Sequence, residues 1–364
     1  MKNKEMKELK KSLKKKPKSI SLRPRDYIST GSTMLNLACS GKPECGFAKG
    51  KYYFIVGDSA SGKTFLTLTC LAEASINKHF KDYRYIYDNS EDGALMDMSK
   101  FFGEKVAAKL EPPSTKKEDG ETIPIYSSTI EEFYYHADDA LKQGKPFIYI
   151  LDSMDSLSSK SEGDKFEETK RAYRKGNKTA GSFGDGKARM NSMNLRRLLT
   201  PLRKSGSILI IISQTRDNLG ISSDPKTRSG GKSLRFYACL EIWSSIIGRI
   251  KKTVKGKERQ LGIKCKLQIK KNRLSGKERT VVTPIYYSIG IDDIGSCIDY
   301  LIEEGHWKGT KGKVIAPEFN FEGSIVKLIH QIEKENMEKD LKLIVNDVWN
   351  EIEEACEVQR KRRY

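Results

Sequence analysis

Short apolar runs alternate with amphipathic stretches between residues 52 and 213. The runs that favour strands are 52–56, 83–87, 147–151 and 208–213, and the stretches with helical spacing are 63–79, 130–143 and 188–204. Nearly continuous apolar strands separated by helices are typical of a parallel sheet that is covered on both faces. The pattern therefore predicts an α/β fold with a mainly parallel central sheet.

Two long segments, at about 158–188 and 215–231, interrupt this alternation and are rich in polar residues and glycine. Loops of this length inside a compact domain are usually functional or mobile. Strand-like patterns return at 238–243, 265–271 and 281–289, and helical patterns follow from residue 295. We therefore expect three parts: a basic N-terminal arm with a short helix (1–27), a core (28–290) and a small helical C-terminal domain (291–364).

The charge balance narrows the possible partners. The 364 residues include 67 Lys and Arg against 48 Asp and Glu, a formal net charge of +19. This surplus predicts a polyanionic partner, most simply nucleic acid. We expect no membrane span and no secretion signal, because no apolar run is long enough for either. The seven cysteines have no zinc-ligand spacing, so we interpret them as reduced core thiols of a cytosolic protein.

Residues 57–64 match the phosphate-binding loop (P-loop) pattern G-x-x-x-x-G-K-[ST], between an apolar run and a helical stretch. In that context the backbone N–H groups and the helix N-terminus face phosphates, and the alternative of a simple glycine turn is disfavoured. Lys63 would reach the outer phosphates of ATP, and the Thr64 hydroxyl would bind magnesium. The candidate nucleotide-binding residues are Gly57, Asp58, Ser59, Ala60, Ser61, Gly62, Lys63 and Thr64.

Carboxylates follow two of the expected strands. Asp152 comes directly after the run 147–151, where it could bind magnesium directly or through water. Hydrolysis also needs a base that orients water, and Glu91, after the run 83–87, is our candidate. Asp88 is the alternative base, and an ordinary loop acid is the other interpretation of either residue.

Four segments in order resemble the RecA family of homologous-recombination ATPases, over about residues 28–304. They are 28–38 before the P-loop, IISQTR at 211–216, GGKSLRFY at 230–237, and Lys271-Asn272-Arg273. Asp217 and Met98 depart from the family pattern, at positions that the family uses for DNA spacing and for adenine stacking. The resemblance implies a P-loop ATPase core of RecA type.

The resemblance also implies roles for single residues. Gln214 matches a glutamine that senses the γ-phosphate and orders the second DNA-binding loop. Lys271 and Arg273 match cations that reach the ATP of a neighbouring subunit, so the catalytic site would be complete only in an assembly. The residues themselves leave open that both are solvated charges on an edge strand.

The family's DNA contacts map onto both long segments. In the first, Lys187, Arg189, Ser192 and Arg196 are candidates, and the spacing of the last three predicts one stripe on a helix that could follow a phosphate backbone. In the second, the candidates are Arg216, Leu219, Arg228, Gly230 and Gly231. Each cation could instead be a solvated surface charge.

The expected function is a DNA-dependent ATPase that uses ATP and Mg²⁺, forms filaments on single-stranded DNA, and pairs that strand with homologous duplex DNA. The alternatives are a ring helicase or translocase with the same core, and a nucleotide-binding recombination mediator. Expected partners are single-stranded and duplex DNA, further copies of the chain, and single-strand-binding or loader proteins. The expected location is the cytoplasm, at a nucleoid or in a phage-infected cell.

Overall fold

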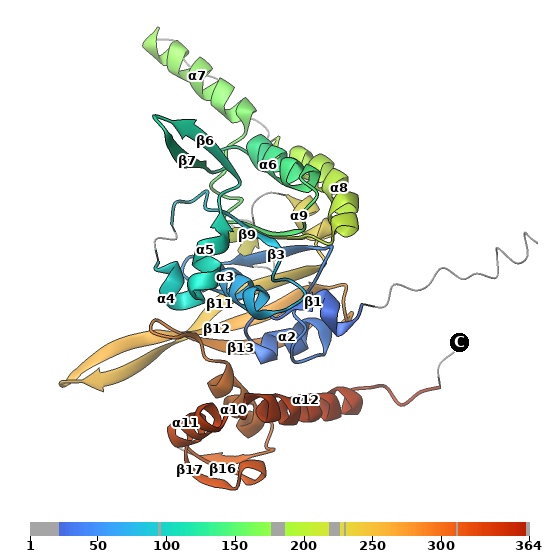
Figure 1. Ribbon diagram of the computed structural model, residues 1–364, viewed down its shortest axis with the longest axis vertical. Helices are drawn as coiled ribbons and strands as arrows, with labels where there is room; N and C mark the ends of the chain where they lie inside the picture. The colour runs from blue at the N-terminus through green and yellow to red at the C-terminus, as the bar shows by residue number, and fades with distance from the viewer. Residues whose placement is uncertain are drawn as a thin grey trace, which may run out of the picture.

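The computed structural model describes residues 22–93, 96–175, 186–217, 226–228, 231–310 and 312–361 (Figure 1). The expected N-terminal arm lies almost wholly outside these residues. A ten-stranded sheet runs through the molecule in the order β14-β13-β12-β11-β3-β9-β8-β4-β5, and β10 pairs with β9. Its strands are β3 (Tyr52–Gly57), β4 (Arg84–Asp88), β5 (Leu110–Glu111), β8 (Phe147–Leu151), β9 (Ile208–Asp217), β10 (Lys226–Arg228), β11 (Leu240–Val254), β12 (Lys257–Asn272), β13 (Thr280–Tyr286) and β14 (Gly290–Ile291).

The sheet is parallel from β11 to β5 and antiparallel from β11 to β14. Every residue of β3 and β8 is buried, because helices cover both faces. Successive β3 residues alternate between two apolar clusters, with Tyr53 and Ile55 in one and Phe54 and Val56 in the other. The predicted α/β class with a mainly parallel sheet is confirmed.

The helices form two layers. On one face lie α2 (Thr33–Ser40), α3 (Lys63–Ile76), α4 (Met98–Phe102) and α5 (Glu104–Lys109); on the other lie α6 (Ile130–Lys142), α8 (Lys187–Ser205) and α9 (Lys232–Tyr237). The predicted helices at 63–79, 130–143 and 188–204 agree with α3, α6 and α8 to within three residues at each end. A short antiparallel pair, β1 (Tyr27–Ile28) and β2 (Phe47–Ala48), precedes β3.

The loop interpretation of the first long segment is wrong over α7 (Lys160–Arg174). A capping box starts this helix: the Ser159 hydroxyl accepts from the N–H of Glu162, and the Glu162 carboxylate accepts from the N–H of Ser159. None of its residues is buried, and it projects from the top of the molecule (Figure 1). The polar composition that suggested a loop is therefore that of a solvent-exposed helix. Nearby, β6 (Ser114–Glu118) and β7 (Glu121–Ile125) form a separate hairpin.

The strands β11 and β12 are much longer than the sequence pattern predicted. The predicted runs 238–243 and 265–271 are the ends of a hairpin that pairs Leu240 with Asn272 and continues to Val254 with Lys257. The part of this hairpin nearest its turn is polar, so apolar alternation did not predict it as a strand. It extends beyond the rest of the sheet (Figure 1).

The C-terminal part contains α10 (Asp293–Glu303), α11 (Ile325–Glu335) and α12 (Glu338–Ala355), as the helical pattern predicted. It also contains an antiparallel sheet of β15 (Lys308–Thr310), β16 (Lys313–Ala316) and β17 (Phe321–Ser324), which was not predicted. Leu341 and Val345 of α12 belong to the same apolar cluster as the α3 face of the central sheet. The C-terminal part therefore shares a core with the rest of the molecule.

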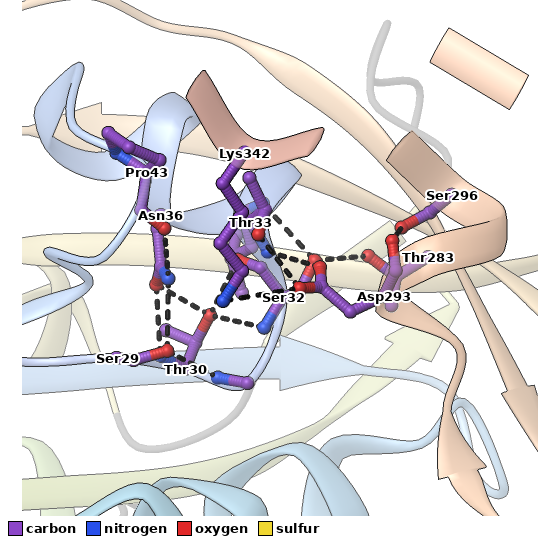
Figure 2. A network of polar contacts seen from close by, with 12 residues as sticks. Ser29, Thr30, Ser32, Thr33, Asn36, Pro43, Thr283, Asp293, Ser296 and Lys342 are labelled. Carbon is purple, nitrogen blue, oxygen red and sulfur yellow. Dashed lines mark hydrogen bonds and ion pairs between the residues drawn. The ribbon is translucent and has the colours of Figure 1, made fainter. Parts of the chain in front are cut away.

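A network of polar contacts joins the C-terminal part to the segment that precedes the P-loop (Figure 2). The Asp293 carboxylate, at the start of α10, accepts from the Thr33 backbone N–H at 2.6 Å and from the Thr33 hydroxyl at 2.8 Å. Lys342 of α12 lies 3.7 Å from the same carboxylate. The hydroxyl of Ser32, which caps α2, is 3.2 Å from that of Thr283. These contacts fix α10 and α12 against the segment that precedes the P-loop.

No helix in the described part of the chain is sufficiently long and apolar to traverse a lipid bilayer. The cysteines 39, 45, 70, 239, 265 and 297 are buried and Cys356 is exposed.

We expect the salt bridge between α12 and the sheet to make stability depend on pH. Arg279 donates to Glu353 at 2.5 and 2.8 Å, and these bonds, with Lys277, lower the pKa of Glu353 to about 2. A carboxylate whose pKa is lower in the folded state stabilises the fold above its unfolded pKa of 4.5, and this contribution is lost as the pH falls toward 2. Glu353→Gln should lower the unfolding midpoint at pH 7 by about 2 to 4 °C and flatten its acid dependence.

The control is Glu351→Gln, an exposed position on the same helix. Thermal unfolding from pH 7 to pH 2.5 checks the prediction. Parallel acid profiles for wild type and Glu353→Gln would contradict it.

Candidate nucleotide and nucleic-acid site

The P-loop lies between the carboxyl end of β3 and the first turn of α3. Ser61 closes it by donating its hydroxyl and its N–H to the Asp58 carbonyl, at 2.7 and 3.3 Å. Gly62 has a φ of +83°, and a Cβ atom there would lie 2.6 Å from the Ile285 side chain. Glycine adopts this positive φ without strain, and any larger residue at position 62 would also push against the Ile285 side chain. The loop therefore has the curled backbone that the motif predicts.

Lys63 points back across the loop. Its Nζ donates to the carbonyls of Gly57 at 3.0 Å and Asp58 at 2.6 Å. Burial lowers the pKa of Lys63, and the nearby carboxylates of Asp152 and Glu91 oppose this shift. The ammonium group is thus held at the centre of the loop, where a bound phosphate would meet it.

Thr64 and Asp152 lie together, as the magnesium hypothesis requires. The Thr64 hydroxyl donates to Asp152 Oδ2 at 2.6 Å, and the Tyr87 hydroxyl donates to the same atom at 3.0 Å. Burial raises the pKa of Asp152, and these two hydrogen bonds oppose that shift. Hard oxygen donors beside a lysine and a helix N-terminus fit a magnesium nucleotide. Tyr87 was missed by the sequence analysis.

The two candidate bases have different surroundings. Asp88 is completely buried and accepts hydrogen bonds from the Ser127 N–H at 2.9 Å, the Ser127 hydroxyl at 2.6 Å and the Tyr149 hydroxyl at 2.7 Å. Glu91 is exposed, accepts from the Ser153 hydroxyl, and faces the P-loop side of the sheet. The geometry favours Glu91 over Asp88 as the residue that can reach a water molecule.

Gln214 joins the Glu91 carboxylate to β9, the strand that leads into the second long segment. Its side-chain amide donates to Glu91 Oε1 at 3.0 Å, and its backbone N–H donates to Asp155 Oδ2 at 2.6 Å. The next residue, Thr215, donates its hydroxyl to Asp58 of the P-loop. Asp155 was not among the residues predicted from the sequence, and no pattern marks it, because its role depends on a contact with a residue 59 positions later in the chain.

The candidates of the first long segment lie at the start of α8. Arg189 and Arg196 are exposed and Ser192 is half-buried. All three fall within one helix, as their spacing predicted. Lys187 donates to the Leu157 carbonyl at 3.0 Å and pairs with Glu162 at 2.9 Å, so its ammonium group also holds the start of α7.

The candidates of the second long segment are only partly described. The backbone of Arg216 lies in β9 opposite Thr227, and that of Arg228 lies in β10 opposite Thr215. Leu219 and Gly230 lie outside the described residues. Gly231 has a φ of +83°, and a Cβ atom there would lie 2.7 Å from Ala188 Cβ at the start of α8. The ends of the two segments are therefore in close contact.

Lys271 and Arg273 do not join the P-loop cluster. Lys271 of β12 lies opposite Glu241 of β11, and Glu241 lies opposite Phe54 in the first half of β3. The P-loop, in contrast, follows the carboxyl end of β3. Lys271 donates to the carbonyls of Arg235 at 2.6 Å and Phe236 at 2.7 Å, and Arg273 donates to Phe236 at 2.9 Å. Burial, with the charge of Arg273 next, lowers the pKa of Lys271 to about 8.

These observations define the class of protein. The parts of a P-loop α/β protein are a buried parallel strand, a curled glycine loop that closes on a lysine, and a hydrogen-bonded pair of a threonine in the first turn of α3 and an aspartate that follows β8.

Within that class, the chain is similar to RecA proteins. The RecA N-terminal domain model matches residues 166–292, which lie downstream of the P-loop. "Protein RecA" of Cytophaga hutchinsonii is 28% identical over 283 residues, covering 76% of this chain and 69% of the relative. That of Xanthomonas axonopodis pv. citri is 29% identical over 285 residues (76% and 71%), and that of Rickettsia massiliae 28% over 300 residues (79% and 75%). The chain is therefore similar to RecA proteins over about three quarters of its length.

We expect Asp155 to position Gln214 for catalysis. Asp155→Ala removes the acceptor of the Gln214 N–H, which should lower ATP turnover about tenfold with little change in KM, because the amide is no longer held against Glu91. Asp155→Asn keeps an acceptor oxygen and should retain most of the turnover. Steady-state ATPase assays of both variants check this, and equal turnover in Asp155→Ala and wild type would contradict it.

Proposed function

We propose that this chain is an ATP-dependent DNA recombinase that assembles on single-stranded DNA and pairs it with homologous duplex DNA. The observation that carries the proposal is the contact path from the P-loop to the second long segment. Asp58 contacts Thr215, and Glu91 contacts Gln214, on the strand that leads into that segment. A change at the phosphates therefore has a direct route to a cationic DNA-binding segment.

The nucleotide would be held by the P-loop backbone, Lys63, Thr64 and Asp152. Bound Mg-ATP would supply the phosphoanhydride bond whose hydrolysis drives the cycle. Lys63 would stabilise charge on the outer phosphates, and Thr64 with Asp152 would orient the magnesium ion. Glu91 would accept a proton from the attacking water, and Gln214 holds Glu91 in place through its side-chain amide.

DNA would be bound through its backbone. Arg189, Ser192 and Arg196 form one stripe on α8, and this stripe begins beside Gly231 at the end of the second long segment. Phosphate contacts from such residues carry no sequence information, so recognition would come from base pairing between strands. The net charge of +19 supports this kind of binding.

Lys271 and Arg273 would complete the ATP site of the next subunit. They are far along the sheet from their own P-loop, and they border a cavity lined by the cations Lys232, Arg235 and Lys270. If the nucleotide of a neighbouring subunit approached this surface, these cations would attract its phosphates. Such head-to-tail contacts generate helical filaments when they do not close into rings.

We expect ATP to strengthen DNA binding and Lys63→Ala to abolish that effect. Removing the ammonium group should lower DNA-stimulated ATP turnover by about 10²-fold or more, since its charge is aimed at the reacting phosphates. The control, Lys78→Ala, changes an exposed lysine just beyond the other end of α3. ATPase assays and single-strand binding with ATP or ADP check this.

Equal single-strand affinity with ATP and ADP in the wild type would contradict the proposed switch. Electron microscopy of the ATP complex on single-stranded DNA separates two assemblies. Helical filaments support the recombinase, whereas closed rings would favour a helicase or translocase.

A mixing experiment tests the trans role of Arg273. We expect Arg273→Ala alone to have at least tenfold lower turnover, because an arginine that stabilises phosphoryl-transfer charge contributes strongly. When the two variants Arg273→Ala and Lys63→Ala are mixed in equal amounts, about a quarter of the subunit contacts combine an intact P-loop with an intact Arg273 from the neighbour. The mixture should therefore regain activity at those contacts. No gain over the separate variants would contradict action across subunits.

A further inference from the structure

Asp88, the last residue of β4, carries a carboxylate that the proposed mechanism does not use. Asp88 is completely buried, and a buried carboxylate is costly unless hydrogen bonds replace its water. The Ser127 N–H donates to Oδ1 at 2.9 Å, and the hydroxyls of Ser127 and Tyr149 donate to Oδ2 at 2.6 and 2.7 Å. Three donors from two separate parts of the chain therefore converge on the end of this strand.

The same contacts connect Asp88 to a histidine on α6. The Ser127 hydroxyl has one proton and gives it to Asp88, so its oxygen accepts from the Nδ1–H of His136 at 2.9 Å. Burial raises the pKa of Asp88, and the bonds from Ser127 and Tyr149, followed by the charge of His136, oppose that shift. His136 itself is half-buried. We call Asp88, Ser127, Tyr149 and His136 together the Asp88 anchor.

The Asp88 anchor lies on the face of the sheet opposite to the nucleotide site. Adjacent residues of a strand point to opposite faces, and Tyr149 belongs to the apolar cluster on the α6 side. Tyr87 belongs to the cluster on the α3 side, where its hydroxyl donates to Asp152 at 3.0 Å. The anchor can therefore act on the nucleotide site through the backbone at the end of β4.

That backbone leads directly to the candidate base. The Asp88 carbonyl accepts from the Asp152 N–H at 2.9 Å, and the Asp152 carbonyl accepts from the Glu91 N–H at 3.1 Å. The Asp92 N–H donates to the Asn89 carbonyl at 3.0 Å and closes the turn that contains Glu91. A shift of the strand end would therefore move the Glu91 carboxylate as well.

We propose that Asp88 is a positioning residue for ATP hydrolysis: the Asp88 anchor fixes the end of β4, and the fixed strand end holds the turn 89–92 so that Glu91 faces the attacking water. The proposal rests on the proposed function, because it explains how the candidate base is held in place. If Asp88 served stability alone, loss of one donor would lower the unfolding midpoint without a selective effect on turnover.

The test removes one donor at a time from the full-length chain. Ser127→Ala deletes the hydroxyl that joins Asp88 to α6 and keeps the backbone donor, and Tyr149→Phe deletes the other hydroxyl. The matched control is Ser128→Ala, because the Ser128 hydroxyl donates to Glu132 and not to Asp88. ATP turnover with single-stranded DNA, the KM for ATP and the thermal unfolding midpoint are measured for each variant.

We expect kcat to fall about tenfold in Ser127→Ala and in Tyr149→Phe, because a small displacement of the base is enough to slow the reaction. The KM for ATP should stay within about twofold of wild type, since Lys63 and the P-loop backbone bind the nucleotide on the other face of the sheet. Ser128→Ala should match wild type in both constants.

His136 provides a second pair of variants that leaves the buried groups unchanged. His136→Leu removes the N–H that supports Ser127 and should lower kcat about threefold, which corresponds to the loss of one hydrogen bond. His136→Asn keeps an N–H close to the position of Nδ1 and should retain most of the turnover. Because His136 is half-buried, both substitutions are compatible with the fold.

Hydrogen exchange measures the same effect in the absence of ATP. In Ser127→Ala the amides of Glu91 and Asp92 should exchange about tenfold faster than in Ser128→Ala, whereas those of α3 should be unchanged. This measurement separates the two proposals. A wild-type protein that hydrolyses no ATP would contradict the proposed function, and the exchange rates would still show whether the Asp88 anchor holds the turn.

Equal kcat and equal exchange rates in Ser127→Ala and Ser128→Ala would overturn the proposal. A rise in KM together with a lower unfolding midpoint would also overturn it, because Asp88 would then support the fold in general. Equal turnover in His136→Leu and His136→Asn would overturn the part of the proposal that includes His136.

Discussion

The parallel pairing of β3, β8 and β9 is the constraint on which the site depends. It brings the carboxyl ends of three strands to one edge, so that residues distant in sequence meet there: Lys63 after β3, Asp152 after β8, and Gln214 near the end of β9. The sheet is stable because its strands are apolar on both faces and helices cover each face. The polar groups at this edge are therefore carried on a closely packed, rigid base.

The P-loop and the strand that leads into the second long segment are connected through side chains with two partners each. Glu91 accepts from both Ser153 and Gln214, and Asp58 accepts from Thr215 while its carbonyl accepts from Lys63. In such an arrangement a proton or a phosphate that takes one partner changes the contacts of the other. Coupling of this kind needs no long-range distortion of the core, because all the groups are at adjacent strand ends.

The sequence predicted the parts of the fold that obey local rules. The P-loop, Asp152 and the apolar strands follow from fixed spacing and hydrophobic alternation, and α8 follows from helical periodicity. The α7 helix was missed because most of its residues are polar and none is buried, so that the Ser159–Glu162 capping box was the main sign of a helix. The far half of the β11–β12 hairpin was missed for a similar reason, and Asp155 could not be found because its partner is set by tertiary packing.

Gly231 and Ala188 give the two cationic segments a shared boundary. A side chain larger than hydrogen at residue 231 would overlap the first turn of α8, since its Cβ atom would come within 2.7 Å of Ala188. Because there is no space between them, the end of the second segment cannot move toward α8 without displacing the end of the first. A larger side chain at residue 231 would therefore force the two segments apart, and any ligand that contacted both would meet them as one continuous surface.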